Sequence, residues 1–296
     1  MRTDLELLRG CIDIHLHSAP DLYNRISDHV EAARAAREAG FRALVLKSHN
    51  FATAARARLV QSAVPGIDVF GSLCLNLAMG GLNPVAVETA IKYGAKQVYM
   101  PTVDSTNHPS LVGGEIGQHG KGLVVAGGWS EYTKKHPRIR ILDARNELVP
   151  EVRVILGFLA EADVILNCGH LSYEELERLV PAAQAAGVRK IVVDHPYFSR
   201  LSIEQQEKLV RAGALMNYTI GEILPRWWRV SVEGFAAGLR RLGPGNVLVS
   251  SDCGQVHNPP SVEAYRLAIQ LLLEEGFTEA EIRAMFHEKP ATLLYE

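Results

Sequence analysis

The sequence predicts a (β/α)8 barrel, and three observations support this fold class. Short apolar runs typical of buried strands alternate with amphipathic helical segments along most of the chain. Such alternation produces parallel strands joined by right-handed crossover helices. Eight of these units fit into about 250 residues, the usual length of this barrel. An open doubly wound sheet is the alternative, but the sequence has no glycine-rich phosphate-binding loop to support it.

The eight predicted strands are apolar runs bounded by turn residues. They occupy residues 11–17, 43–47, 67–75, 97–102, 164–167, 190–193, 214–217 and 247–250. Every strand except the last leads to a helix, and three of these helices begin with a capping pattern. The pairs are Asp28 with Glu31, Ser172 with Glu175, and Ser202 with Gln205.

The alternation is interrupted once, between about residues 105 and 149. This glycine-rich segment contains two strand-like pieces, 123–126 and 138–142, so we expect a long loop with a small hairpin after the fourth strand. Its glycines would allow the loop to act as a mobile cover. We expect His108 and His119, which lie in this segment, to be exposed to solvent. Two additional helices are expected near the C-terminal end, over 261–275 and 278–287.

Composition narrows the class of protein. The chain of 296 residues is 47% hydrophobic and 22% charged, with a net charge of −2, which argues against a nucleic-acid or anionic-membrane partner. We expect one domain over 1–296 that acts on a small molecule, and we leave homo-oligomerisation open. The four scattered cysteines, the lack of a transmembrane-length apolar run and the charged N-terminus, unlike a signal peptide, predict a cytoplasmic protein with reduced thiols.

Polar residues follow every predicted strand, where a barrel of this kind carries its active site. The ends of strands one to eight carry, in order, His15 and His17, Lys47 and His49, Asn76, Thr102 and Asp104, His170, Asp194 and His195, Asn217 and Tyr218, and Asp252. In the first strand, strict alternation would place Asp13, His15 and His17 on one face. Imidazole and carboxylate are the ligands of a catalytic zinc-type site, so the sequence predicts a metal centre.

The order of these ligands resembles that of the amidohydrolase superfamily, over essentially the whole chain. The pattern is His-x-His on strand one, His170 on strand five, His195 on strand six and Asp252 on strand eight. Supporting segments lie at 167–172, 194–196, 251–254 and 289–294.

The resemblance implies a role for each of these residues. His15 and His17 would bind the more buried metal, and Asp252 would share it. His170 and His195 would bind a second metal or assist the substrate and water. Asp252 would also be the general base for a water whose pKa the metal lowers to about 7. Zn²⁺ is the expected ion, with Mn²⁺ and Fe²⁺ as alternatives.

One departure from the superfamily leaves the number of ions, one or two, open. Two-metal members bridge their ions with a carboxylated lysine or a glutamate from strand four, and this strand has neither residue. Lys47 on strand two could carry a bridging carboxylate after reaction with carbon dioxide, which would add it to the catalytic and metal-binding residues. Alternatively, it could pair with Asp13 or bind a substrate anion.

Five further residues are predicted to contact the substrate because they end or follow strands: His49, Asn76, Tyr218, Gln255 and His257. His49 could instead support a metal ligand from behind. Trp227 and Trp228 would line the pocket, form a subunit contact or simply pack against a helix.

These features favour a metal-dependent hydrolase of an amide, lactone or ester bond in a small molecule. A metal-dependent non-oxidative decarboxylase or related lyase of the same superfamily is the first alternative. A non-catalytic metal-binding sensor is the second.

Overall fold

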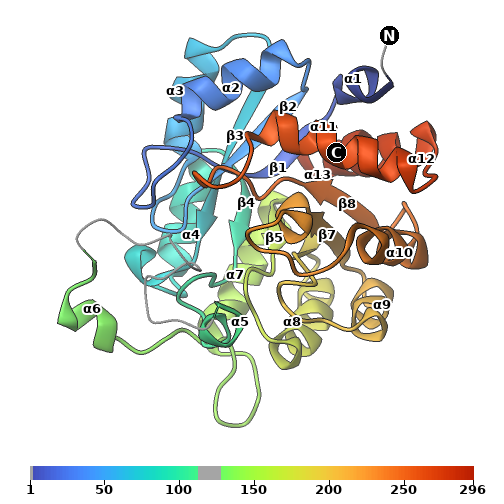
Figure 1. The fold of residues 1–296 in the computed structure, drawn as a ribbon. Helices are drawn as coiled ribbons and strands as arrows, with labels where there is room; N and C mark the ends of the chain where they lie inside the picture. The colour runs from blue at the N-terminus through green and yellow to red at the C-terminus, as the bar shows by residue number, and fades with distance from the viewer. Residues whose placement is uncertain (1–2, 113–127) are drawn as a thin grey trace.

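The computed structural model describes residues 3–112 and 128–296, and it confirms the predicted barrel. Eight parallel strands pair in sequence order, β1 to β8, at the centre of the molecule (Figure 1). They are β1 (Ile12–His17), β2 (Ala43–Lys47), β3 (Asp68–Cys74), β4 (Ala95–Tyr99), β5 (Ile165–Asn167), β6 (Ile191–Asp194), β7 (Leu215–Thr219) and β8 (Val247–Ser250).

The sheet closes through hydrogen bonds between β1 and the residues that follow β8. The Asp252 N–H donates to the His15 carbonyl, and the His17 N–H donates to the Cys253 carbonyl, both at 2.9 Å. Because these bonds join the first strand to the last, residues distant in sequence meet at one end of the barrel.

Helices surround the strands (Figure 1). The helices between strands are α2 (His29–Glu38), α3 (Ala54–Ala63), α4 (Pro84–Lys92), α7 (Pro150–Ala162), α8 (Tyr173–Ala185), α9 (Ile203–Arg211) and α10 (Val232–Leu242). All three predicted capping boxes are present, at the starts of α2, α8 and α9. In the described part of the chain, no helix combines the length and apolar character needed to cross a membrane.

The ends of the chain add helices outside the alternation. Helix α1 (Thr3–Leu8), which the sequence analysis did not anticipate, precedes β1. Helices α11 (Ser261–Glu274), α12 (Glu279–Arg283) and α13 (Lys289–Tyr295) follow β8, in agreement with the expected C-terminal helices.

Aliphatic side chains fill one end of the barrel interior. All of these side chains are completely or almost completely buried. They are Ile12, Ile14, Ala43, Val45, Ile165, Val192, Leu248, Leu293 and Leu294. Helix α13 supplies the last two and thereby closes this end. A larger apolar layer between the strands and the helices holds the rest of the core.

The segment after β4 differs in part from the prediction. It contains two short helices, α5 (His108–Val112) and α6 (Glu131–Lys135), and α6 lies apart from the barrel (Figure 1). The piece at 138–142 is not a strand: Ile139 and Leu142 form only isolated bridges, with Ser105 and Leu148. The predicted piece at 123–126, His119 and the glycines between 113 and 122 lie outside the described residues.

Candidate metal centre and pocket

An irregularity in β1 decides where the two histidines of this strand point. The register between β1 and β2 shifts in the middle of the strand, as in a β-bulge, and this shift re-aims the side chains. Asp13 accepts hydrogen bonds from Ser251 Oγ at 2.5 Å and Ser261 Oγ at 2.6 Å. It therefore lies away from His15 and His17, and the prediction that all three share a face is wrong because the bulge breaks the alternation.

His15, His17 and Asp252 form a buried group whose ligand atoms all lie within 4.8 Å of one another. Asp252 Oδ1 is 3.0 Å from His15 Nε2 and 3.4 Å from His17 Nε2. The Asp252 backbone has a φ of 47°, a left-handed conformation that is costly for a residue with a side chain. Burial raises the pKa of Asp252, but the two imidazoles outweigh this effect and hold it well below its usual range.

The donor set of this group fits a divalent cation. His15 Nδ1 lies 3.1 Å from Asp194 Oδ2, which assigns the ring proton to Nδ1. The Nε2 lone pair is then directed toward the Asp252 carboxylate, an arrangement that a cation between the two groups would stabilise. Two imidazole nitrogens and one carboxylate oxygen, with further positions left open, suit a catalytic Zn²⁺, Mn²⁺ or Fe²⁺ site.

His17 has an unusual partner for a metal ligand. Arg25 Nη2 donates to His17 Nδ1 at 3.1 Å, and Arg25 also pairs with Asp21 at 2.8 Å. Burial and the charge of Arg25 lower the pKa of His17 well below its ordinary value, so the ring is neutral with its proton on Nε2. A cation at Nε2 would move this proton to Nδ1 and break the hydrogen bond from Arg25.

Lys47 is buried beside the group formed by His15, His17 and Asp252. Its Nζ is 2.7 Å from His15 Nε2 and 4.4 Å from the centre of the Tyr99 ring. The alternative in which Lys47 pairs with Asp13 is wrong, because the Asp13 carboxylate is held by two serine hydroxyls. Carboxylation of Lys47 and its role as a bridging ligand stay predictions.

The five histidines that end β1, β2, β5 and β6 form a closed circuit of ring contacts. Going round from His17, the centroid distances are 4.8 Å to His49, 6.1 Å on to His170, 4.9 Å to His195, 5.8 Å to His15 and 5.4 Å back to His17. The structure therefore brings His170 and His195 beside the three-residue group, although they are not part of it. Whether they bind a second ion stays a prediction.

His195 occupies a strained position in the circuit. Its φ of 33° is left-handed, and its N–H donates to the Asn217 carbonyl at 2.9 Å. Burial lowers the pKa of His195 to about 4, against the opposing effects of Asp194 and Asp252. The imidazole is therefore neutral near pH 7 and can accept or donate a hydrogen bond in the pocket, or bind an ion.

His108 is a site residue that the sequence analysis misplaced. We expected it to be solvated, but it is 1% exposed, and its Nδ1 lies 2.8 Å from His170 Nδ1. The two rings stack with centroids 4.8 Å apart. Helix α5 thus brings a sixth imidazole behind His170 and fixes the orientation of that ring.

Two residues predicted to contact the substrate instead support loops. The Asn76 amide donates to the His49 carbonyl and to Thr102 Oγ1, and its oxygen accepts from the Thr102 and Asp104 N–H groups. Gln255 donates to the Asp252 carbonyl at 2.9 Å and accepts from an asparagine amide. Both side chains are fully buried, so we correct their assignment to loop-supporting residues.

The remaining substrate predictions have mixed outcomes. The prediction that Tyr218 contacts the substrate is wrong, because this residue lies in the apolar layer beneath the helices, where its hydroxyl donates to Gln206 at 2.6 Å. The neighbouring Asn217 points inward instead and donates to Asp194. His49 is buried with Nδ1 2.9 Å from Thr102 Oγ1, and its role stays a prediction. So does that of His257, which contacts the Trp227 ring.

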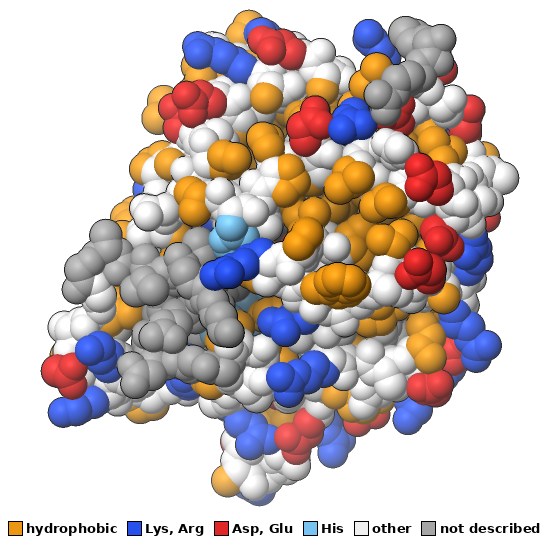
Figure 2. All heavy atoms as spheres, in the orientation of Figure 1, with side chains coloured by type: hydrophobic (Ala, Val, Ile, Leu, Met, Phe, Trp, Pro, Cys, Tyr) orange, Lys and Arg blue, Asp and Glu red, His pale blue; other side chains and the backbone are white. Residues whose placement is uncertain are grey.

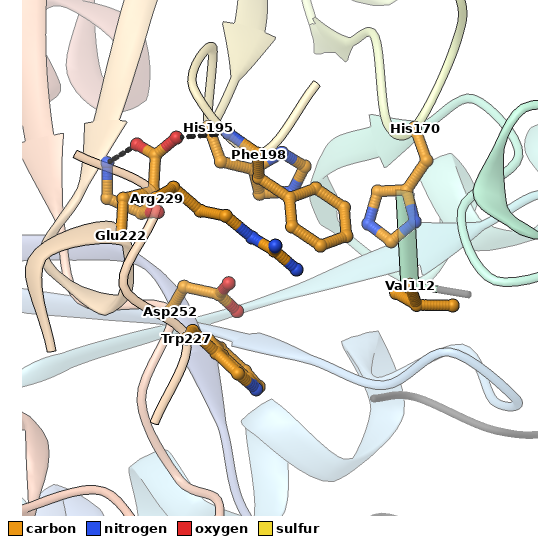
Figure 3. A pocket seen from close by; sticks show the side chains of 9 residues that line it. Val112, His170, His195, Phe198, Glu222, Trp227, Arg229 and Asp252 are labelled. Carbon is orange, nitrogen blue, oxygen red and sulfur yellow. Dashed lines mark hydrogen bonds between the residues drawn. The ribbon is translucent and has the colours of Figure 1, made fainter. Parts of the chain in front are cut away.

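A pocket opens beside Asp252 at this end of the barrel. Basic side chains and a histidine gather in the middle of the face, whereas acidic side chains lie mainly toward its edges (Figure 2). The residues that line the pocket are Val112, His170, His195, Phe198, Thr219, Glu222, Trp227, Arg229 and Asp252 (Figure 3).

The sequence analysis did not identify Phe198, Glu222 or Arg229 as pocket residues. The capping box from Thr219 to Glu222, directly after a strand, was the pattern that could have drawn attention to this segment. The Glu222 carboxylate accepts from the Phe198 and Thr219 N–H groups at 2.7 and 3.1 Å, joining the turns after β6 and β7. Burial raises the pKa of Glu222 to about 8, although these hydrogen bonds oppose it.

Solved structures share this architecture at low sequence identity. An amidohydrolase from Pseudomonas aeruginosa superposes with a TM-score of 0.64 at 12% identity, covering 99% of this chain and 98% of that chain. The probable dipeptidase PvdM from the same organism gives 0.63 at 13%, covering 98% and 96%. A mutant organophosphorus hydrolase from Deinococcus radiodurans gives 0.56 at 15%, covering 96% and 93%. At these identities the likeness concerns the fold alone.

Comparison of sequences adds a family. No curated protein matches the chain. The model of a family of unknown function, DUF6282, matches residues 10–217, which span β1 to β6 and the first part of β7 and include every predicted metal ligand except Asp252. The chain belongs to this family, and it has the fold of the amidohydrolase superfamily.

Proposed function

We propose that the protein is a metal-dependent hydrolase that cleaves an amide, lactone or ester bond of a small molecule. The observation that carries this proposal is the buried group of His15, His17 and Asp252, whose ligand atoms converge beside an open pocket. The structural relatives are an amidohydrolase, a probable dipeptidase and an organophosphorus hydrolase, which is consistent with hydrolysis.

Each residue has a role in this proposal. His15, His17 and Asp252 hold a divalent ion, Zn²⁺ in the first instance. When bound, the ion supplies a Lewis acid that polarises the scissile carbonyl and acidifies water. Asp252 accepts the proton of the attacking water and returns it to the leaving group. His195, neutral and at the pocket wall, donates a hydrogen bond to the substrate.

The test combines metal analysis with turnover. The purified protein is assayed for bound metal by mass spectrometry and for hydrolysis of a panel of amides, lactones and esters. Asp252→Asn should retain the fold, as judged by circular dichroism, while its rate of hydrolysis falls about 10²–10⁴-fold. Wild-type protein that binds no divalent ion, or an Asp252→Asn variant of unchanged turnover, would disprove the proposal. Wild-type protein that binds metal but turns over no substrate would favour a non-catalytic sensor.

A decarboxylase is the second candidate. It is favoured by the three-residue group, in which two imidazoles and one carboxylate could hold a single ion. Release of carbon dioxide from a carboxylate substrate, without hydrolysis of any member of the panel, would replace the hydrolase by this reaction. Two ions per chain together with a carboxylated Lys47 would exclude it in favour of hydrolysis.

A further inference from the structure

The pocket contains a guanidinium that the proposed chemistry does not use. Arg229 lies after β7 and is not part of the group formed by His15, His17 and Asp252. Its side chain extends into the middle of the pocket, between Asp252 and Phe198 (Figure 3). Its backbone N–H donates to the Glu222 carbonyl at 2.7 Å, which anchors the residue to the turn after β7.

The Arg229 side chain is held in place by its surroundings. The guanidinium carbon lies 5.3 Å from the centre of the Phe198 ring, within the range of a cation–π contact. Nη2 also approaches the Leu111 carbonyl at 3.4 Å. A planar guanidinium fixed in this way presents its fork of N–H donors in a defined direction.

The two carboxylates that line the pocket are already engaged. Asp252 lies against His15 and His17, and Glu222 accepts hydrogen bonds from the Phe198 and Thr219 N–H groups. Figure 3 shows the Glu222 carboxylate turned toward these N–H groups and away from the Arg229 guanidinium. Arg229 therefore enters the pocket as a positive charge available to a ligand.

We infer that Arg229 binds an anionic group of the substrate, while the scissile bond lies at the metal group. This inference rests on the proposed function, because it assigns the anion to the molecule that is hydrolysed. A carboxylate or a phosphoryl group would accept two parallel N–H donors from the guanidinium. Phe198, Trp227 and Val112 form the apolar part of the wall, so the substrate is a small anion with an apolar body.

The test measures binding rather than turnover, so it stays informative if hydrolysis is not found. Isothermal titration of the metal-loaded protein uses phenylacetate, benzylphosphonate and the neutral phenylacetamide, which share an apolar ring. Wild-type protein should bind at least one of the two anions about tenfold or more tightly than the amide. The order of the two anions identifies a carboxylate or a phosphoryl group as the preferred ligand.

Because a bound metal also attracts anions, variants are needed to distinguish its contribution to anion binding from that of Arg229. Arg229→Gln should reduce the preference for the anion to about twofold, whereas Arg229→Lys, which keeps the charge but not the fork, should retain part of it. Arg226→Gln is the matched control, because Arg226 is exposed on the same turn but does not line the pocket. It should leave the preference unchanged.

Several outcomes would overturn the inference while leaving the proposed hydrolase intact. These are equal binding of anions and amide by the wild-type protein, an unchanged preference in Arg229→Gln, or no binding of any probe at millimolar concentration. Conversely, a preference that disappears in Arg229→Gln, in a protein that hydrolyses nothing, would support the anion site and disprove the proposed hydrolysis.

Discussion

The two ends of the barrel interior are built from the same strands but differ in chemistry. At one end β1 contributes Ile12 and Ile14, which pack with Leu293 and Leu294 of α13. At the other end the same strand contributes His15 to a circuit of five imidazoles. One end therefore stabilises the fold by apolar burial, and the other concentrates titratable groups, which are unfavourable to bury unless they have partners.

The largest effect is expected at the histidine end. His15→Gln would remove a ligand from the candidate metal centre, so the proposed hydrolysis should fall about a thousandfold or more, roughly 4 kcal/mol of transition-state stabilisation. Metal content by mass spectrometry and turnover should fall together. His29→Gln, a change to a buried histidine outside the site, is the control. Full metal occupancy in His15→Gln would remove this residue from the ligand set.

A change at the aliphatic end should affect stability alone. Leu294→Ala leaves a cavity beneath β1 and should lower the free energy of unfolding by about 3 kcal/mol in denaturant titrations, without altering metal affinity. Leu267→Ala, at a leucine with 36% of its surface exposed, should change the free energy of unfolding by about 0.5 kcal/mol at most. A weaker affinity for metal in Leu294→Ala would show that the two ends are coupled.

The contact between Arg25 and His17 gives a smaller, positive effect. Since Arg25 holds the His17 proton on the nitrogen that faces Asp252, Arg25→Gln should increase metal affinity about tenfold in a chelator competition. Arg25→Lys keeps the charge but changes the donor, which separates repulsion of the cation from the effect on the proton. Weaker metal binding by Arg25→Gln would mean that Arg25 supports the site.

The smallest effect concerns His29, at the start of α2. Burial, with a contribution from Arg56, lowers the pKa of His29 to about 4, so the native state binds fewer protons than the unfolded state. Its contribution to stability is present above pH 6.5, decreases as the pH falls toward 4 and is then constant. We expect a loss of about 1 kcal/mol between about pH 6.5 and pH 5 that is absent in His29→Gln. Identical pH profiles would contradict this account.

The sequence predicted the fold well, because strand periodicity and helix capping are local. Each of the eight expected strands overlaps an observed one, and the expected capping residues lie at the starts of their helices. Placing the candidate ligands near one another also followed from strand order, since the ends of parallel strands meet at the same rim.

The failures concern single-residue register and non-local contacts. The bulge in β1 turned Asp13 away from His15, and Tyr218 was assigned to the pocket although Asn217 and Thr219 occupy that face. A shift of one residue reverses the side of a strand, and composition does not reveal such shifts. His108 and Arg229 reach the site from loops after β4 and β7, whose paths depend on tertiary packing.

The hydrogen bonds that join β1 to the residues after β8 bear on when the site can form during synthesis. The Asp252 N–H donates to the His15 carbonyl, and the Asp252 carboxylate lies against the His15 ring, so this contact completes both the barrel and the candidate metal centre. His15 and His17 leave the ribosome early, whereas Asp252 is translated after all eight strands. A metal site made of these three residues would therefore be complete only after most of the polypeptide has been made.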